Sequence, residues 1–227
     1  MPKKGKVTTE IIDVIEILCE DSIGTLIFCH GLGDNPKSWL FLAEELTRNL
    51  NLKIILVCAP TTYVSVNKID MPSWFDILEI PIKPNMPDNG QYLDDSVSIL
   101  NNIINLEVNN GVSPDKIILG GFSQGATLSL VAGLKYKERL GGIFMFSGWR
   151  HLKLMLKNYC NCDIPILISH GGKDKIVLYE NALNLRDELS KYKFKKITFK
   201  SYPGMGHNTS TKEISDLILW INQIFKN

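Results

Sequence analysis

One short stretch decides the fold: KIILGGFSQGATLSLVAGLK, residues 116–135. It opens with an apolar run typical of a strand buried on both faces, and it continues into a helical pattern. Between them Gly121, Ser123 and Gly125 form the motif G-x-S-x-G, which places a serine on a tight strand–helix turn. The glycines leave room where strand and helix crowd together. The stretch predicts a nucleophilic serine, and the alternative is a glycine-rich turn with an incidental serine.

Outside this stretch, short apolar runs alternate with longer helical patterns, which is typical of parallel strands joined by crossover helices. The expected strands are Ile11–Leu18, Thr25–Cys29, Ile54–Cys58, Lys116–Leu119, Gly142–Phe146, Ile164–Ser169 and Lys196–Tyr202. The expected helices are Trp39–Leu50, Leu93–Asn109, Gln124–Lys135, Tyr179–Tyr192 and Lys212–Phe225. The pattern predicts one α/β domain, residues 1–227, with a mostly parallel central sheet and helices on both of its faces.

Composition narrows the class of protein. The chain has 227 residues, and its 25 Lys plus Arg nearly balance 24 Asp plus Glu, which gives a formal net charge of +1. A near-neutral chain lacks the basic footprint of a protein whose main work is binding nucleic acid. A chain of this length can bury a sizeable core without disulfides. We therefore expect a globular protein that does not bind nucleic acid.

The cysteines and the termini give no sign of a secreted or membrane-spanning protein. Five irregularly spaced cysteines are unlike a disulfide framework. Cys160, Cys162 and Asp163 could contact a metal, but plain loop thiols fit the spacing better. Residues 1–10 form a basic, flexible tail by expectation, without a signal sequence, and no apolar run is long enough to cross a bilayer. We expect a cytoplasmic protein, with peripheral membrane contact as an option.

A nucleophilic serine needs a base, and the chain has four histidines. His207 lies in a glycine-rich loop directly after the last expected strand, at the edge of the sheet where open α/β folds place catalysis. His170 ends a strand and is expected to pack in the sheet, with a catalytic role as the alternative. His151 lies in a loop and is expected to be solvated. His30 directly follows the strand Thr25–Cys29. The second oxyanion-hole segment is expected there, so His30 is expected to have an architectural role.

The base needs an acid to orient it. Asp174 follows the strand Ile164–Ser169, whereas Asp163 precedes that strand and lies at the opposite edge of the sheet. The chain order Ser123, Asp174, His207 is that of the α/β-hydrolases. In this hypothesis His207 deprotonates Ser123, an acyl-enzyme forms, and water releases the acid. The backbone N–H groups of Gln124 and of a residue near Leu32 hold the oxyanion, and no metal or cofactor is required.

The stretch from Pro60 to Tyr92 is expected to be irregular, because it carries Pro72, Pro81, Pro84 and Pro87. A loop of this length in a compact domain usually serves function. Its apolar residues are candidates for the wall of an acyl-chain groove, with a loop folded over the core as the equal alternative. The groove candidates are Tyr63, Val64, Val66, Ile69, Met71, Trp74 and Phe75. Trp74 and Phe75 are also expected to include core anchors.

Several blocks of the sequence resemble one family of hydrolases. They are HGLGD at residues 30–34, MPSWFD at 71–76, IILGGFSQG at 117–125 and GMGH at 204–207. Together, and in this order, they are similar to the acyl-protein thioesterases of the phospholipase/carboxylesterase group. The resemblance runs from about Thr25 to the C-terminus. It implies the triad Ser123, Asp174 and His207, with Leu32 and Gln124 at the oxyanion hole.

The resemblance also implies a substrate class. Members of the family remove long-chain acyl groups, typically palmitate, from protein cysteines, with side activity on small esters and lysophospholipids. We therefore expect S-acylated proteins or lipid esters as substrates. The alternatives are a carboxylesterase or lysophospholipase of small lipids and a non-catalytic lipid-binding protein on the same fold. Three departures stand out. The turn Gly172-Lys173-Asp174-Lys175 is altered and more basic, residue 2 is Pro rather than an acylated Cys, and the segment Pro81 to Tyr92 matches no family pattern.

Overall fold

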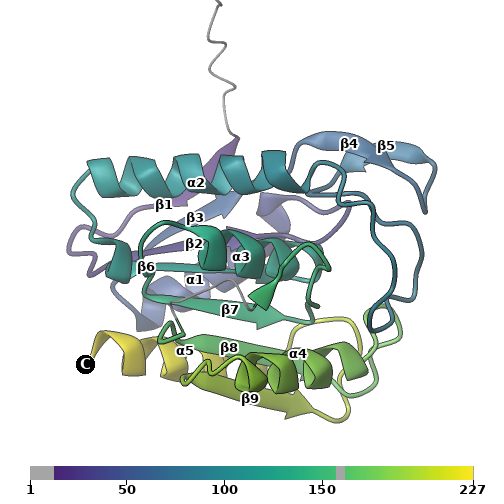
Figure 1. Ribbon diagram of the computed structural model, residues 1–227. Helices are drawn as coiled ribbons and strands as arrows, with labels where there is room; N and C mark the ends of the chain where they lie inside the picture. The colour runs from purple at the N-terminus through teal and green to yellow at the C-terminus, as the bar shows by residue number, and fades with distance from the viewer. Residues whose placement is uncertain (1–12, 157–161, 227) are drawn as a thin grey trace, which may run out of the picture.

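The computed structural model describes residues 13–156 and 162–226. Within them a seven-stranded sheet has the order β1-β3-β2-β6-β7-β8-β9 (Figure 1). Strand β1 is antiparallel to β3, and the other neighbours in this sheet are parallel. The strands are β1 Val14–Ile17, β2 Thr25–Cys29, β3 Lys53–Val57, β6 Ile117–Phe122, β7 Gly142–Phe146, β8 Ile166–Gly171 and β9 Ile197–Tyr202.

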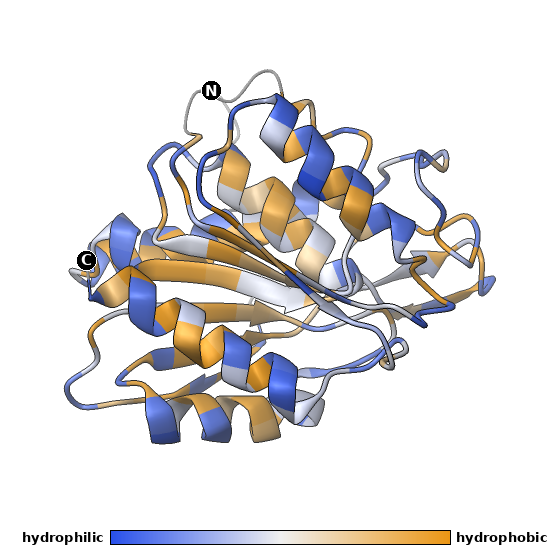
Figure 2. Cartoon of the chain, turned by 90° about the horizontal axis from the view of Figure 1, so that it is seen from below, coloured by the Kyte–Doolittle hydropathy of each residue, from blue (hydrophilic) through white to orange (hydrophobic). Residues whose placement is uncertain are grey.

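Helices cover both faces of this sheet. The helices α2, α3 and α4 pack their buried residues into one apolar cluster, and α1 and α5 pack into a second cluster on the opposite face. Figure 2 shows the apolar sides of the helices turned toward the strands. The helices are α1 Leu40–Asn49, α2 Leu93–Asn109, α3 Gln124–Lys135, α4 Glu180–Lys191 and α5 Thr211–Phe225, with 3-10 turns at Pro36–Trp39 and Pro114–Lys116. The expected fold class, an α/β-hydrolase sheet with helices on both faces, is confirmed.

The parallel strands bring distant residues to one edge of the sheet. Ser123 follows β6, Asp174 follows β8 and His207 follows β9, so all three lie beyond the carboxyl ends of their strands. The loop that begins at His30 follows β2, which pairs with β6. This is the edge where an open α/β sheet forms its ligand sites.

Several expected elements have slightly different bounds. The first strand is shorter than Ile11–Leu18, and residues 11 and 12 lie outside the described residues. The expected helix Trp39–Leu50 is preceded by a 3-10 turn, because Pro36 suits a first helical position and the Asn35 side chain accepts a hydrogen bond from the Lys37 N–H at 3.0 Å. The strand expected from Ile164 begins at Ile166, directly after Pro165, which has no N–H to donate to a ladder.

The largest correction concerns the stretch that was expected to be irregular. Residues 61–72 form a two-stranded antiparallel hairpin, β4 Thr61–Val64 and β5 Ile69–Pro72. Its turn places Lys68 in the left-handed region at φ 59°. The four-residue strands are too short to show a clear alternation, and Pro72 disfavours a strand unless it lies at an end or edge, as it does here.

Two expectations concern residues without a description. Residues 1–10, the expected basic tail, and Cys160 of the C-x-C pair lie outside the described residues. Among the helices of residues 13–156 and 162–226, none has the length and apolarity that a bilayer span requires.

Candidate active site

Ser123 stands on a strained turn between β6 and α3. Its backbone has φ 55° and ψ −116°, a conformation that residues with a side chain rarely adopt. The turn is possible because both flanking glycines touch the end of β2. A Cβ atom would lie 2.4 Å from the Cys29 carbonyl oxygen at Gly121 and 2.1 Å from it at Gly125. The spacing of G-x-S-x-G therefore follows from the close packing of β2, β6 and α3.

The structure brings the three expected triad residues together in one hydrogen-bonded chain. The Ser123 Oγ lies 3.0 Å from Nε2 of His207, and Nδ1 of His207 lies 2.6 Å from Oδ2 of Asp174. With Nδ1 donating to the carboxylate, Nε2 is free to accept the serine proton. Ser123 is only 8% exposed, and it borders a cavity.

Asp174 is held as a carboxylate by its surroundings. Burial acts to raise its pKa, but hydrogen bonds from His170 and His207 and from backbone N–H groups outweigh burial and hold the pKa well below its usual range. Oδ1 accepts from the N–H groups of Ile176 and Val177, each at 2.9 Å. An acid that stays ionised and fixed can orient the His207 ring and stabilise its protonated form.

The loop after β2 is held from several sides. His30 is buried, its Nε2 accepts from the Ala59 N–H at 3.0 Å, and its Nδ1 faces the Gly31 carbonyl at 2.7 Å. The Gly33 N–H donates to the Pro72 carbonyl at 2.8 Å, and Trp39 Nε1 donates to Asp34 at 2.8 Å. His30 thus has the architectural role expected of it, and the loop holds Leu32 beside Ser123, where both line one cavity.

Gln124 fastens a distant segment to the nucleophile turn. Its Oε1 accepts from the Trp74 N–H at 3.0 Å, and its Nε2 donates to Ser73 Oγ at 2.9 Å and to the Phe75 carbonyl at 2.6 Å. Its backbone N–H is the first of α3 and has no acceptor within the helix. The side chain therefore braces the turn, while the backbone N–H remains available to an oxyanion.

The other two histidines differ in how well the sequence predicted them. His170 is buried in the sheet as expected, and its Nε2 lies 2.8 Å from the Val177 carbonyl and 3.3 Å from Asp174 Oδ2. His151 was expected to be solvated, and this is wrong: it is completely buried, 3.3 Å from Asp88 and edge-on to the Phe75 ring. Burial lowers its pKa, although the charge of Asp88 opposes this. The fold of residues 83–92 over this side chain was not apparent from the sequence.

An apolar cavity of about 260 Å³ adjoins the hydroxyl of Ser123. Most of its wall away from the triad is apolar and comes from five separate segments of the chain. These wall residues are Leu32, Ile77, Ile80, Ile82, Phe122, Trp149, Ile176 and Val177. Apart from Leu32, sequence reasoning did not assign these residues to a site. The one local signal was the position of Ile176 and Val177 directly after Asp174.

The seven groove candidates are not brought to this cavity. Val64, Trp74 and Phe75 are buried in the core, and Val66 packs against it. Tyr63 and Ile69 lie on the hairpin and are 47% and 56% exposed. For the candidates in β4 and β5 the reason is strand alternation, which turns Val64 to the core and Tyr63 and Ile69 to solvent.

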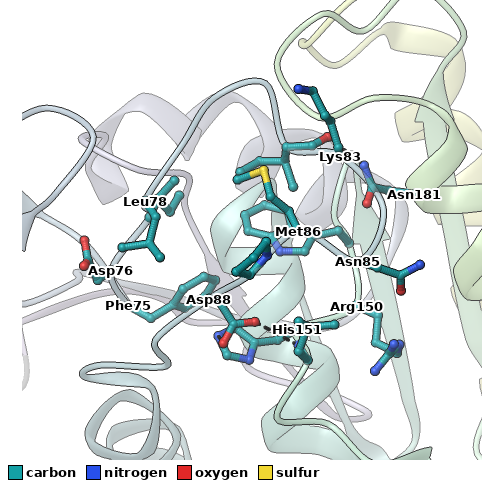
Figure 3. Close-up of a pocket in the computed structure, with 15 residues that line it drawn as sticks. Phe75, Asp76, Leu78, Lys83, Asn85, Met86, Asp88, Arg150, His151 and Asn181 are labelled. Atoms are coloured by element: carbon teal, nitrogen blue, oxygen red, sulfur yellow. Dashed lines mark hydrogen bonds and ion pairs between the residues drawn. The ribbon is translucent and has the colours of Figure 1, made fainter.

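A second, narrower cavity of about 30 Å³ lies beyond Ile77, Ile82 and Trp149, which line both cavities. Its outer wall is residues 78–88, here called the strap. Figure 3 shows Asp88 and His151 together at one end of this cavity and Asn181 at the other. Asn181 Nδ2 donates to the Ile82 carbonyl at 2.8 Å, and the Leu152 N–H donates to Asp88 at 3.0 Å, so the strap is held near its middle and at its C-terminal end.

The chain is similar to proteins of known family. Acyl-protein thioesterase 1 of Yarrowia lipolytica is 36% identical over 210 residues, which cover 89% of this chain and 92% of that protein. A probable carboxylesterase SOBER1-like of Arabidopsis thaliana is 36% identical over 207 residues, covering 87% of this chain and 78% of that protein. The crystal structure of Arabidopsis thaliana SOBER1 superposes with a TM-score of 0.82 at 30% identity, covering 88% of this chain and 98% of that one.

The structure of Zea mays acyl-protein thioesterase 2 superposes with a TM-score of 0.80 at 28% identity, covering 94% of this chain and 99% of that one. The family model Phospholipase/Carboxylesterase matches residues 13–225. This match spans nearly the whole chain, and the sequence relatives extend over most of it. The chain belongs to the phospholipase/carboxylesterase family of α/β-hydrolases, and it is a serine hydrolase.

Proposed function

We propose that the protein is a thioesterase that removes long-chain acyl groups from S-acylated cysteines of proteins through an acyl-enzyme. The observation that carries the proposal is the hydrogen-bonded chain of Ser123, His207 and Asp174 beside an apolar cavity. The relatives named acyl-protein thioesterase support the same substrate class.

In the proposed mechanism, His207 Nε2 accepts the hydroxyl proton as Ser123 Oγ attacks the thioester carbonyl. The backbone N–H groups of Leu32 and Gln124 stabilise the oxyanion. The carbon–sulfur bond then breaks, and the cysteine sulfur leaves with the proton from His207. Water, deprotonated by His207, attacks the acyl-enzyme and releases the fatty acid, and Ser123 regains its proton. Asp174 keeps His207 in the correct tautomer throughout.

The acyl chain is proposed to lie against Ile80, Ile82, Ile176 and Val177, in place of the hairpin residues expected from the sequence. These side chains border the cavity at the Ser123 hydroxyl, and each buried methylene of the substrate contributes about 0.8 kcal/mol. This assignment makes the strap and the turn after Asp174 the determinants of chain length.

A second candidate function is hydrolysis of small lipid esters, as a carboxylesterase. Two observations favour it: the SOBER1-like relative, and the cavity of about 260 Å³, which falls just below the range of roughly 300–1,000 Å³ typical of ligand pockets. A small cavity fits a short chain better than a long one. The two functions share all of the chemistry and differ in the substrate.

The deciding experiment compares kcat/KM for a palmitoylated cysteine peptide, the matched octanoyl and acetyl peptides, and the corresponding oxyesters. The proposal predicts the highest kcat/KM for the long-chain thioester. A maximum at short oxyesters would favour the carboxylesterase. The Ser123→Ala variant is the control, and it should lose activity on every substrate by about 10³-fold or more.

We further propose transient contact with membranes through the mouth of the cavity. Ile80 and Ile176 line this cavity and are 37% and 40% exposed, and the exposed Lys173 and Lys175 flank Asp174. Apolar side chains beside lysines suit a lipid surface that carries negative charge. Sedimentation with vesicles containing phosphatidylserine tests this proposal, and equal sedimentation of a variant with Lys173 and Lys175 changed to Gln would contradict the electrostatic part.

A further inference from the structure

Glu213 is a buried acid that the triad mechanism does not use. It lies in the first turn of α5 and is 1% exposed. Its Oε1 accepts a hydrogen bond from Ser169 Oγ at 2.6 Å, and its Oε2 is buried without a hydrogen-bond partner among the described residues. A carboxyl group in this setting costs free energy of folding, since burial without full hydrogen bonding is unfavourable. Contacts on the surface of α5 do not explain why the Glu213 side chain points inward.

The residues around Glu213 suggest what this side chain does. Ser210 is the N-cap of α5, and its Oγ accepts from the Glu213 N–H at 3.2 Å, as in a capping box. In a capping box the glutamate side chain returns to the N-cap N–H, but here it turns inward to strand β8. The contact therefore joins the start of α5 to the sheet rather than completing the cap.

This contact links two segments that carry triad residues. Ser169 is five residues before Asp174 on the β8 side, and Ser210 is three residues after His207. The first half of the His207 loop is already tied to the same strand end, because the Gly172 N–H donates to Tyr202 and the Lys173 N–H donates to Met205, both at 2.9 Å. The bond between Ser169 and Glu213 fastens the second half.

We propose that Glu213 is a positioning residue for the His207 imidazole. Its carboxylate fixes the first turn of α5, and with it the C-terminal half of the loop 203–210, to the strand that leads to Asp174. This inference rests on the proposed triad, because it concerns the placement of the base within it. It predicts that loss of the bond slows the chemical step without weakening substrate binding, since a small displacement of a catalytic group lowers kcat.

The charges facing Glu213 make its ionisation relevant near neutral pH. Burial raises the pKa of Glu213 to about 7; hydrogen bonds from Ser169 and within the N-cap oppose this, and the charge of Asp216 adds to it. Asp216, one turn along α5, is itself bound by Tyr202 and Lys200 of β9 and by Lys212. The ionised carboxylate is the better acceptor for Ser169, so the proposed positioning is strongest when Glu213 is charged.

The test compares Glu213→Ala, Glu213→Gln, Ser169→Ala and the double alanine variant on a short soluble ester. We expect Glu213→Ala and Ser169→Ala each to lower kcat by about 10-fold or more with KM unchanged. The double variant should have the same kcat as the single variants, because both substitutions remove the same hydrogen bond, between Ser169 and Glu213. Glu213→Gln should recover most of kcat, since the amide oxygen accepts from Ser169. It should also remove one ionisation from the acid limb of kcat/KM against pH.

A matched control is available at the opposite end of the sheet. Glu107 is also buried, and its Oε2 accepts from Thr25 Oγ1 at the same distance, 2.6 Å. Glu107→Gln and Thr25→Ala should lower the melting temperature and leave kcat and the pH profile unchanged.

Unchanged kcat in folded Glu213→Ala would overturn the proposal, and so would an equal fall in kcat for the Glu107 control. If Glu213→Ala does not fold, Ser169→Ala decides, because it removes only a hydroxyl, and unchanged kcat in that variant overturns the proposal. Ser123→Ala, assayed in the same series, separates the two hypotheses: retained activity there would reject the triad itself rather than the role of Glu213.

Discussion

The nucleophile turn, residues 116–135, and the cover segment, residues 60–92, contribute to the same cavity but follow different rules. The helix expected over Gln124–Lys135 has the observed bounds, and Ser123 lies on the expected turn. The cover segment was expected to be irregular, and it contains the β4–β5 hairpin and the strap. The difference lies in what holds each region in place.

Local sterics determine the nucleophile turn. The glycines are required because backbone atoms of β2 and α3 lie within 3 Å of where a Cβ would be, and this requirement is visible as a motif. Distant polar contacts determine the cover segment: Asn181 binds the Ile82 carbonyl from 99 residues away, and Asp88 accepts from the Leu152 N–H 64 residues away. Contacts of this kind leave no periodicity in the segment that they hold.

The largest effect is expected at Asp174, which was predicted as the triad acid from its position in the chain order. Asp174→Asn should keep the fold and lower kcat by about 10³- to 10⁴-fold, because an amide that donates toward Nδ1 favours the wrong His207 tautomer. Burst-phase kinetics on an activated ester measures it. Asp163→Asn is the control and should be nearly silent, since Asp163 is exposed and pairs with Lys195 at the opposite edge of the sheet. If the two results were exchanged, the acid would have to be reassigned.

The sequence predicted more of the triad than of the cavity, for a physical reason. Three residues that end parallel strands must meet at one edge of the sheet, so topology alone places Ser123, Asp174 and His207 near one another. The wall of the cavity joins Ile80, Trp149 and Ile176, which share no pattern. The burial of His151 depends in the same way on the Asp88 loop that covers it. A residue can therefore be placed from the sequence when its own strand or turn determines its position, and not when a distant contact does.

A substitution of Gly125 should show how much stability is lost when a side chain is added at the nucleophile turn. At Gly125 an added Cβ would lie 2.1 Å from the Cys29 oxygen and 2.5 Å from the His30 oxygen, both of them backbone atoms. We expect Gly125→Ala to lower the free energy of unfolding by about 3 kcal/mol or more. Urea denaturation measures this. Gly204→Ala is the matched control, because a Cβ there meets nothing within 4 Å and its effect should be small.

Glu213 combines the features of the two regions. It lies in a helix that the sequence predicted, but its side chain is held by a distant residue, Ser169. Its pKa in the folded state, about 7, lies above its ordinary value of 4.5, so the folded protein favours the protonated form. The resulting stabilisation is complete below pH 4.5 and is lost as the pH rises through 7. Relative to Glu213→Gln, the wild type should lose about 2–3 kcal/mol of unfolding free energy between pH 5 and pH 8. Denaturation curves whose difference is constant over this range would contradict the raised pKa.

The smallest expected effect asks whether the cover segment sets substrate preference. Ile80 and Ile176 line the cavity and are partly exposed, so their replacement by Ser should spare the core. The backbone bond from Ile176 to Asp174 does not depend on the side chain. We expect the double variant to lower kcat/KM for palmitoyl esters by about 10-fold or more, because apolar contact with several methylenes is lost. Acetyl esters, too short to reach these positions, should be hydrolysed at the wild-type rate.

The hairpin supplies the matched control for this last test. Tyr63 and Ile69 have similar or greater exposure and do not border the cavity, so changing both to Ser should leave both substrates unaffected in the absence of lipid. A loss of long-chain activity confined to the hairpin variant would mean that residues 63–71 bind the acyl chain, as the sequence suggested. An equal loss on acetyl and palmitoyl esters in the Ile80 and Ile176 variant, with a lower melting temperature, would mean that these residues brace the site rather than select the chain. A selective loss in that variant alone would show that contacts absent from any motif determine the substrate, while the motif determines the chemistry.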